Sequence, residues 1–190
     1  PKTPTEINHP TKVRTQPAAK SANGRAGRFT TLVNGDVGAG KDVAVSLTSS
    51  APILAERPLY FHACPGGVCA DGADVALGAA PAQSRYFAEG YTGSGFQEYL
   101  TLENPGSTPG TATVTYLFTD STGTARAVPV PGLARVTLDV NAAVGPGRQV
   151  SAEISSTVAL VAERPIYFNA CPGSVCMNGG SVSSGATSIP

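Results

Sequence analysis

Residues 55–69 read AERPLYFHACPGGVC, and residues 162–176 read AERPIYFNACPGSVC. The two stretches lie 107 positions apart, and the same offset continues without a gap, so that residues 28–83 recur as residues 135–190. Identity this dense at a single offset indicates an internal duplication rather than chance. A repeated unit therefore determines the fold, and the chain contains this unit once in full and once in part.

A different block, residues 85–131, lies between the two copies. Its apolar runs, at 99–102 and 112–118, are separated by the turn sequences NPG at 104–106 and DSTG at 120–123, which is typical of strands and tight turns. We name this segment block A and the duplicated segment block B. In chain order the segments are residues 1–27, block B, block A and block B. One of the two B blocks, which each form half of a module, therefore has no block A as its partner.

Apolar and polar residues alternate within block B, as in Val43, Val45 and Leu47, which indicates strands with one buried face. The 22 glycines and 16 prolines favour short elements joined by turns, and no helical period is present. We expect an all-β fold of antiparallel, immunoglobulin-like β-sandwich modules, with a half module at 28–84 and a complete module at 85–190. The strands predicted for block B are 29–34, 43–48 and 52–62, with 136–141, 150–156 and 158–169 as their equivalents.

Residues 1–27 form a basic, proline-rich arm in which only Ile7 and Val13 are strongly apolar. Prolines at positions 4, 10 and 17 exclude a long helix there. Two interpretations remain open: a linker or tail, or an extended arm that lies on another surface. In the second case Ile7 and Val13 are candidate interface residues.

The four cysteines form two equally spaced pairs, Cys64 with Cys69 and Cys171 with Cys176, each enclosing a Pro-Gly turn. Two local disulfides are favoured over a zinc site, because the neighbouring His62 is replaced in the second copy by Asn169. Persistent disulfides predict an oxidising compartment, so we expect an extracellular location at the cell surface.

Three longer motifs carry a family resemblance: YFAEGYTGSGFQEYLTLENP at 86–105, VGPG at 144–147 and AERPIYF at 162–168. Together they resemble a tandem repeat of secreted and surface-attached bacterial proteins, and the resemblance covers residues 28–190. It implies extracellular β-sandwich modules and brings no catalytic or ligand-binding residues. A chain that starts within a module departs from the longer arrays usual for this repeat.

Catalytic chemistry is not expected. The two histidines are His9, in the arm, and His62, which the second copy lacks, so neither marks a repeated active site. Asp71 and Asp74 lie in a glycine-rich stretch, but the second copy has no acidic residue at either place, so a solvated turn is favoured over a calcium site. We therefore predict no enzyme activity, no cofactor and no metal.

The overall charge and hydropathy limit the kinds of binding partner that we expect. The 13 basic and 13 acidic residues cancel, and no long apolar run is present. We expect neither nucleic-acid binding nor membrane insertion. Both copies keep a Glu-Arg-Pro triplet, and a structural role is favoured, with each charge paired across strands or with a neighbouring module. Alternatively, Arg57 and Arg164 line a recurring interface.

Two functions follow from the unmatched B half. The first is a structural protein, a subunit of a head-to-tail surface filament or pilus-like assembly, in which strands from neighbouring subunits complete the half module. The second is an adhesive or spacer module belonging to a longer secreted cell-surface repeat protein.

Overall fold

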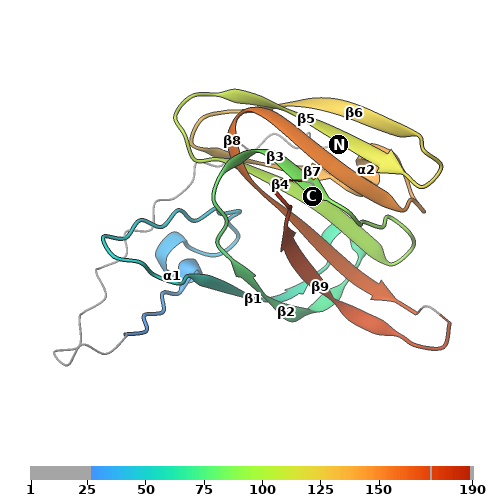
Figure 1. Ribbon diagram of the computed structural model, residues 1–190. Coiled ribbons are helices and arrows are strands. Elements are labelled where there is room, and N and C mark those ends of the chain that lie inside the picture. The colour runs from blue at the N-terminus through green and yellow to red at the C-terminus, as the bar shows by residue number, and fades with distance from the viewer. Residues whose placement is uncertain (1–26, 172, 189–190) are drawn as a thin grey trace.

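The computed structural model describes residues 27–171 and 173–188 (Figure 1). The strands, in chain order, are β1 (Glu56–Ala63), β2 (Ala70–Leu77), β3 (Ala82–Phe87), β4 (Phe96–Asn104), β5 (Gly110–Phe118), β6 (Gly123–Val130), β7 (Ala134–Asp139), β8 (Val150–Ala170) and β9 (Met177–Ser184). The helices are α1 (Val33–Val37), α2 (Val140–Val144) and the single 3-10 turn η1 (Pro65–Gly67). None of the described helices is long and apolar enough to cross a membrane.

Strand β8 organises the complete module, because its 21 residues belong to two sheets. Its first part pairs with β3 and β5, and β5 pairs with β6. Its later part pairs with β4 and β9, and β4 pairs with β7. All these pairings are antiparallel, so the chain forms two facing sheets, β6-β5-β8-β3 and β7-β4-β8-β9 (Figure 1). The predicted all-β sandwich is confirmed.

The core lies between these two sheets and is built from one face of each strand. On β5, for example, Ala112, Val114 and Tyr116 are buried, whereas the residues between them are more exposed. Burying a leucine or isoleucine side chain contributes about 1.5–3 kcal/mol. The largest buried apolar side chains are those of Tyr116, Leu100, Leu102, Ile154, Leu160, Val114, Val130 and Val140.

Two strand boundaries predicted in the second copy are wrong. The segments 150–156 and 158–169 form one continuous strand, because β8 passes from the first sheet to the second without a turn. The strand predicted at 136–141 ends at Asp139, whose carboxylate accepts a hydrogen bond from the Ala142 N–H at 2.9 Å and caps helix α2. A short helix therefore replaces the end of that strand.

The first copy keeps the local structure of block B but not its sheets. Helix α1 matches α2 at the 107-residue offset, and both end in a glycine with positive φ, Gly38 at 85° and Gly145 at 83°. The β1–β2 hairpin likewise matches the end of β8 with β9. The strands predicted at 29–34 and 43–48 are absent, and that prediction is wrong. These residues have no described strand of a second A block to pair with.

The exposed fractions of equivalent side chains show the effect of the missing strand pairing. Ile154 is 1% exposed in the complete module, whereas its equivalent Leu47 is 43% exposed. Leu160 is 1% exposed, and its equivalent Ile53 is 60% exposed. The same type of side chain is therefore core in the second copy and surface in the first.

We expect Ile154→Ala to lower the free energy of unfolding by about 2–5 kcal/mol, because it leaves a cavity between the sheets. The matched substitution Leu47→Ala should change it by less than about 0.5 kcal/mol, since that side chain is exposed. Denaturant unfolding of the full chain measures both. Equal losses would contradict the difference between the two copies.

Candidate interaction surface

The two halves of the complete module are joined by a set of hydrogen bonds that we call the module seam, between residues 90–98 of block A and 139–150 of block B. The Val150 N–H donates to the Gly90 carbonyl at 2.9 Å. The Thr92 N–H donates to the Arg148 carbonyl at 2.9 Å, and the Gly147 N–H donates to the Thr92 carbonyl at 3.0 Å. Backbone pairing thus holds the loop of block A against the turn after α2.

Side chains of Thr92 and Asn141 extend the seam. The Thr92 hydroxyl donates to the Gly145 carbonyl at 2.7 Å and accepts from the Arg148 N–H at 3.0 Å. The Asn141 amide accepts from the Glu98 N–H at 2.9 Å and donates to the Phe96 carbonyl at 2.8 Å. Each of these two side chains satisfies two groups of the other block, so the seam joins specific residues rather than general β-surfaces.

Glu98 is a buried acid within the seam, with 2% of its surface exposed. Its carboxylate accepts a hydrogen bond from the Tyr91 N–H at 2.9 Å. Burial raises the pKa of Glu98 to about 7, although the charge of Arg164 and the Tyr91 N–H oppose the rise. A Cβ at position 90 would collide with the Glu98 carboxylate, so any other residue there would force that side chain to move. Glu98 belongs to no motif that marks it in the sequence, where it directly precedes the apolar run at 99–102.

The first copy presents block B's half of the seam without a partner. The equivalents of the seam residues of block B are Asn34, Gly38, Gly40, Lys41 and Val43. Within the described residues, the Asn34 side chain, the Gly38 carbonyl and the N–H groups of the other three make no hydrogen bond. The helix α1 that carries Asn34 is nevertheless formed, with its cap bond from the Gly38 N–H at 3.0 Å. We call these groups of the first copy the half seam. Its helix is formed, but no described residue hydrogen-bonds to its groups.

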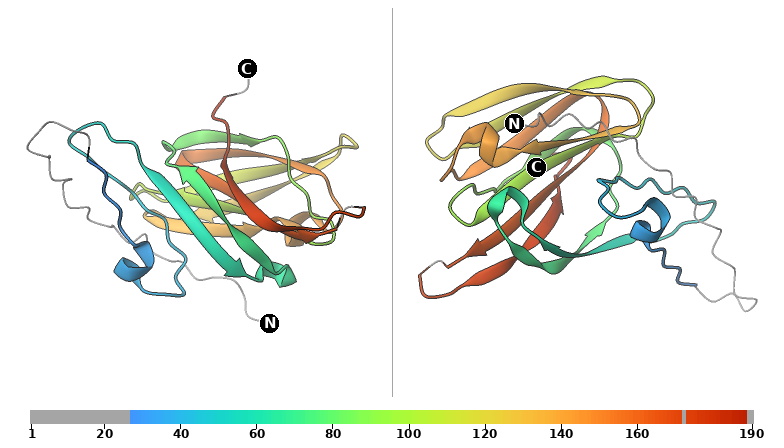
Figure 2. Two further views of the ribbon diagram at one scale, coloured as in Figure 1. Left: turned by 90° about the horizontal axis from the view of Figure 1, so that it is seen from below. Right: turned by 180° about the vertical axis from the view of Figure 1, so that it is seen from behind.

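A second surface of the first copy is in use, because the β1–β2 hairpin lies against β8 and β9 of the complete module (Figure 2). Alternate residues of β1 face the module. Among them, Arg57 donates to both carboxylate oxygens of Glu163 at 3.0 and 3.2 Å. Phe61 packs edge-on against Tyr167, with ring centroids 5.4 Å apart. An ion pair and an aromatic pair thus join the two copies.

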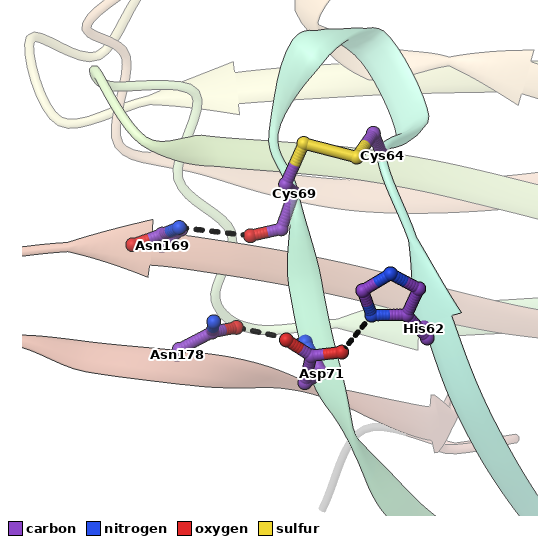
Figure 3. The surroundings of a disulfide bond; sticks show 6 residues. All are labelled: His62, Cys64, Cys69, Asp71, Asn169 and Asn178. Carbon is purple, nitrogen blue, oxygen red and sulfur yellow. Dashed lines mark hydrogen bonds and ion pairs between the residues drawn. A yellow bond between two sulfur atoms is a disulfide. The ribbon is translucent and has the colours of Figure 1, made fainter.

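Asparagines of the second copy complete this contact near the first disulfide (Figure 3). The Asn169 amide donates to the Cys69 carbonyl at 2.9 Å, and the Asn178 side chain accepts from the Asp71 N–H at 2.8 Å. The Val182 N–H donates to the Asp74 carboxylate. In the sequence, Asn169 and Asn178 stand out only as the residues that take the places of His62 and Asp71 in the second copy. Their role is to satisfy polar groups at the edge of the hairpin.

The two repeated arginines lie in different settings. Arg57 lies at the contact between the copies, as just described, whereas the Arg164 guanidinium lies 5.8 Å from the ring centre of Phe87 in its own module. Two buried nitrogen atoms of Arg164, Nε and Nη1, have no hydrogen-bond partner among the described residues. The predicted pairing with a neighbouring module is seen for Arg57. The two other interface candidates, Ile7 and Val13, lie outside the described residues.

The disulfide prediction is confirmed, since Cys64 joins Cys69 and Cys171 joins Cys176, each with a Cα–Cα distance of 3.8 Å. His62 hydrogen-bonds through Nδ1 to Asp71, and this bond raises the pKa of His62. Both side chains are exposed. No group of three or more histidine, cysteine or acidic side chains suited to a metal ion occurs among the described residues.

The raised pKa of Glu98 predicts a pH-dependent stability. Because the folded pKa, about 7, lies above the ordinary value of 4.5, this group's stabilising contribution is complete below about pH 4.5 and is lost as the pH rises towards 7. The loss should amount to ~3 kcal/mol. Unfolding of the native chain and of Glu98→Gln, compared between pH 4 and 8, isolates this contribution. A constant difference between them would show that folding leaves the pKa of Glu98 unchanged.

The docked hairpin predicts a selective effect of Phe61→Ala. Loss of the contact with Tyr167 should speed amide exchange in β2, including the Asp71 N–H bonded to Asn178, by ~10-fold or more. Amides of the core strand β5 should be unaffected. Tyr60→Ala is the matched control, because this neighbouring side chain points away from the module and is 80% exposed. Equal effects of the two substitutions would contradict the contact.

No protein-family model matches the chain, and no curated protein is similar to it. Two solved structures are similar at low identity. The crystal structure of Thermotoga maritima 1070 is 19% identical, covers 58% of this chain and 97% of its own, and has a TM-score of 0.49. The Anabaena sensory rhodopsin transducer is 17% identical, covers 45% of this chain and 97% of its own, and has a TM-score of 0.41. Neither similarity bears on function.

Proposed function

We propose that the chain is an extracellular structural protein, a subunit of a surface filament or pilus-like assembly in which strands of a neighbouring subunit complete the half module at 28–84. The observation that carries the proposal is the exposure of Leu47 and Ile53, whose equivalents Ile154 and Leu160 form the core of the complete module. Exposing apolar side chains to water is unfavourable in free energy, and strands added by another chain remove this cost by covering them.

The unpaired backbone of residues 43–54 supports the same proposal. In the second copy the equivalent residues pair with β3, β4 or β5, and only the first copy lacks those pairings within the described residues. Free strand edges recruit further strands. If one subunit completes the next head to tail, the contact is heterologous and propagates into a filament unless rotation closes a ring.

The two disulfides support an extracellular setting, because such bonds persist in oxidising compartments. Each closes a short loop at the tip of a hairpin, in the first copy and in the second. Both hairpin tips are therefore closed by a disulfide, whether or not a sandwich surrounds them. A surface protein exposed to variable conditions benefits from such local closure.

A second function is favoured by the count of blocks. The described residues hold two B blocks but one A block, so a copy that lends its A block to a neighbour uncovers its own second B block. If chains exchange their A blocks, each chain therefore still has one B block without an A block. A spacer or adhesive module in a longer cell-surface repeat protein would receive the missing block from another repeat.

In the assembly proposal a neighbouring subunit donates either its arm, residues 1–27, or an A-type sheet, and deletion of residues 1–27 tests the first donor. Deleting them should convert concentration-dependent oligomers of the full chain into monomers or amorphous aggregates, because the exposed half module loses its cover. Analytical ultracentrifugation and negative-stain microscopy measure the outcome. Normal filaments from the truncated chain would exclude the arm from assembly, and a full chain that is monomeric at every concentration would contradict the proposal.

A further inference from the structure

We infer that the half seam of the first copy is a recognition site for an additional A-type half module, one that carries a loop of the form GYTGxGFxE. The inference rests on the proposed completion of the half module and names the segment that completes it. Such a segment is the counterpart of residues 85–131, which in this chain are already joined to the second B block.

The evidence is a direct comparison within one molecule. In the complete module, the loop at 90–98 meets an asparagine side chain, the carbonyls of a glycine and an arginine, and three backbone N–H groups of block B. The first copy offers the same six groups, in the same order and spacing, on Asn34, Gly38, Gly40, Lys41 and Val43. Because α1 and its glycine cap are already formed, these groups need little rearrangement to bind.

Apolar side chains beside the half seam point to the same occupant. Leu47 and Ile53 are the sequence equivalents of Ile154 and Leu160, which pack in the core of the complete module. A ligand that bonded only the seam groups would leave these side chains in water. An A-type half module supplies both the loop and the strands, so it covers the polar and the apolar parts of the surface together.

One position gives the site its own specificity. The Gln97 amide donates to Asp139 at 2.9 Å in the complete module, but the equivalent of Asp139 in the first copy is Leu32. A glutamine at that place in the incoming loop would lose its acceptor. The preferred partner therefore has an apolar residue there, which packs against the exposed Leu32 side chain.

Completion also changes the partner of the hairpin. Arg57 is bonded to Glu163 now, whereas its equivalent Arg164 lies within its own module beside Phe87 and close enough to Glu98 to lower the pKa of that acid. In a completed first module, Arg57 would face the acid of the incoming loop. An incoming A block would therefore replace the contact that the β1–β2 hairpin now makes with the second copy.

The test inserts a second copy of residues 81–134 between residues 27 and 28 of the full chain, which reproduces the natural junction between residues 134 and 135. A companion chain carries Gln97→Leu in the inserted copy only. Amide exchange at residues 43–47 should slow by at least ~100-fold relative to the original chain, and more in the companion chain. Residues 150–154 of the complete module serve as the internal reference.

Asn34→Ala provides the matched control. In the inserted chains it should abolish most of the new protection at residues 43–47, as Asn141→Ala does at residues 150–154, and in the original chain it should have no effect. Unchanged exchange at 43–47 in both inserted chains, with residues 150–154 still protected, would overturn the inference.

A competing occupant is tested on the original chain. Protection of residues 43–47 that rises with concentration and disappears on deletion of residues 1–27 would assign the site to the arm of a second copy, and would also overturn the inference. Absence of filaments would count only against the proposed function, because the inserted chains report recognition within one polypeptide.

Discussion

The structure depends on the pairing of β8 with the strands of block A. This single strand contributes to both sheets, and every other strand of the complete module except β6 and β7 is hydrogen-bonded to it. A strand has no internal backbone hydrogen bonds, so it exists only where neighbours supply them. Block B can therefore form its sheets in the second copy, where block A is present. In the first copy, residues 38–55 belong to no strand.

The two copies separate local from non-local structure. Helix α1, its glycine cap, the β1–β2 hairpin and the disulfide all form in the first copy, because each is stabilised by residues close together in sequence. The long strand and the core do not form there, because their partners come from a distant block. The comparison of the two copies therefore separates the structure that forms without block A from the structure that forms with it.

Polar groups at the seam explain why the two halves recognise each other. A sandwich held by apolar contact alone would tolerate many partners, but Asn141 and Thr92 each hydrogen-bond to particular groups of the other block. Leaving any of them unpaired in a buried place costs about 1–3 kcal/mol. The seam therefore adds specificity to the apolar drive for burial, and this is the property that an assembling or repeating module needs.

The sequence determined the repeat, the all-β class and the two disulfides, because duplication, alternation and cysteine spacing are all visible along the chain. It also indicated that one B half lacks a partner. Only the tertiary structure showed that β8 crosses between sheets, that Asp139 starts a helix, and that Glu98 is buried with a raised pKa. It alone placed Arg57 on Glu163 and Phe61 on Tyr167. Apart from the local cap of Asp139 on α2, these features join residues far apart in sequence, and no local pattern specifies which distant group a side chain will meet.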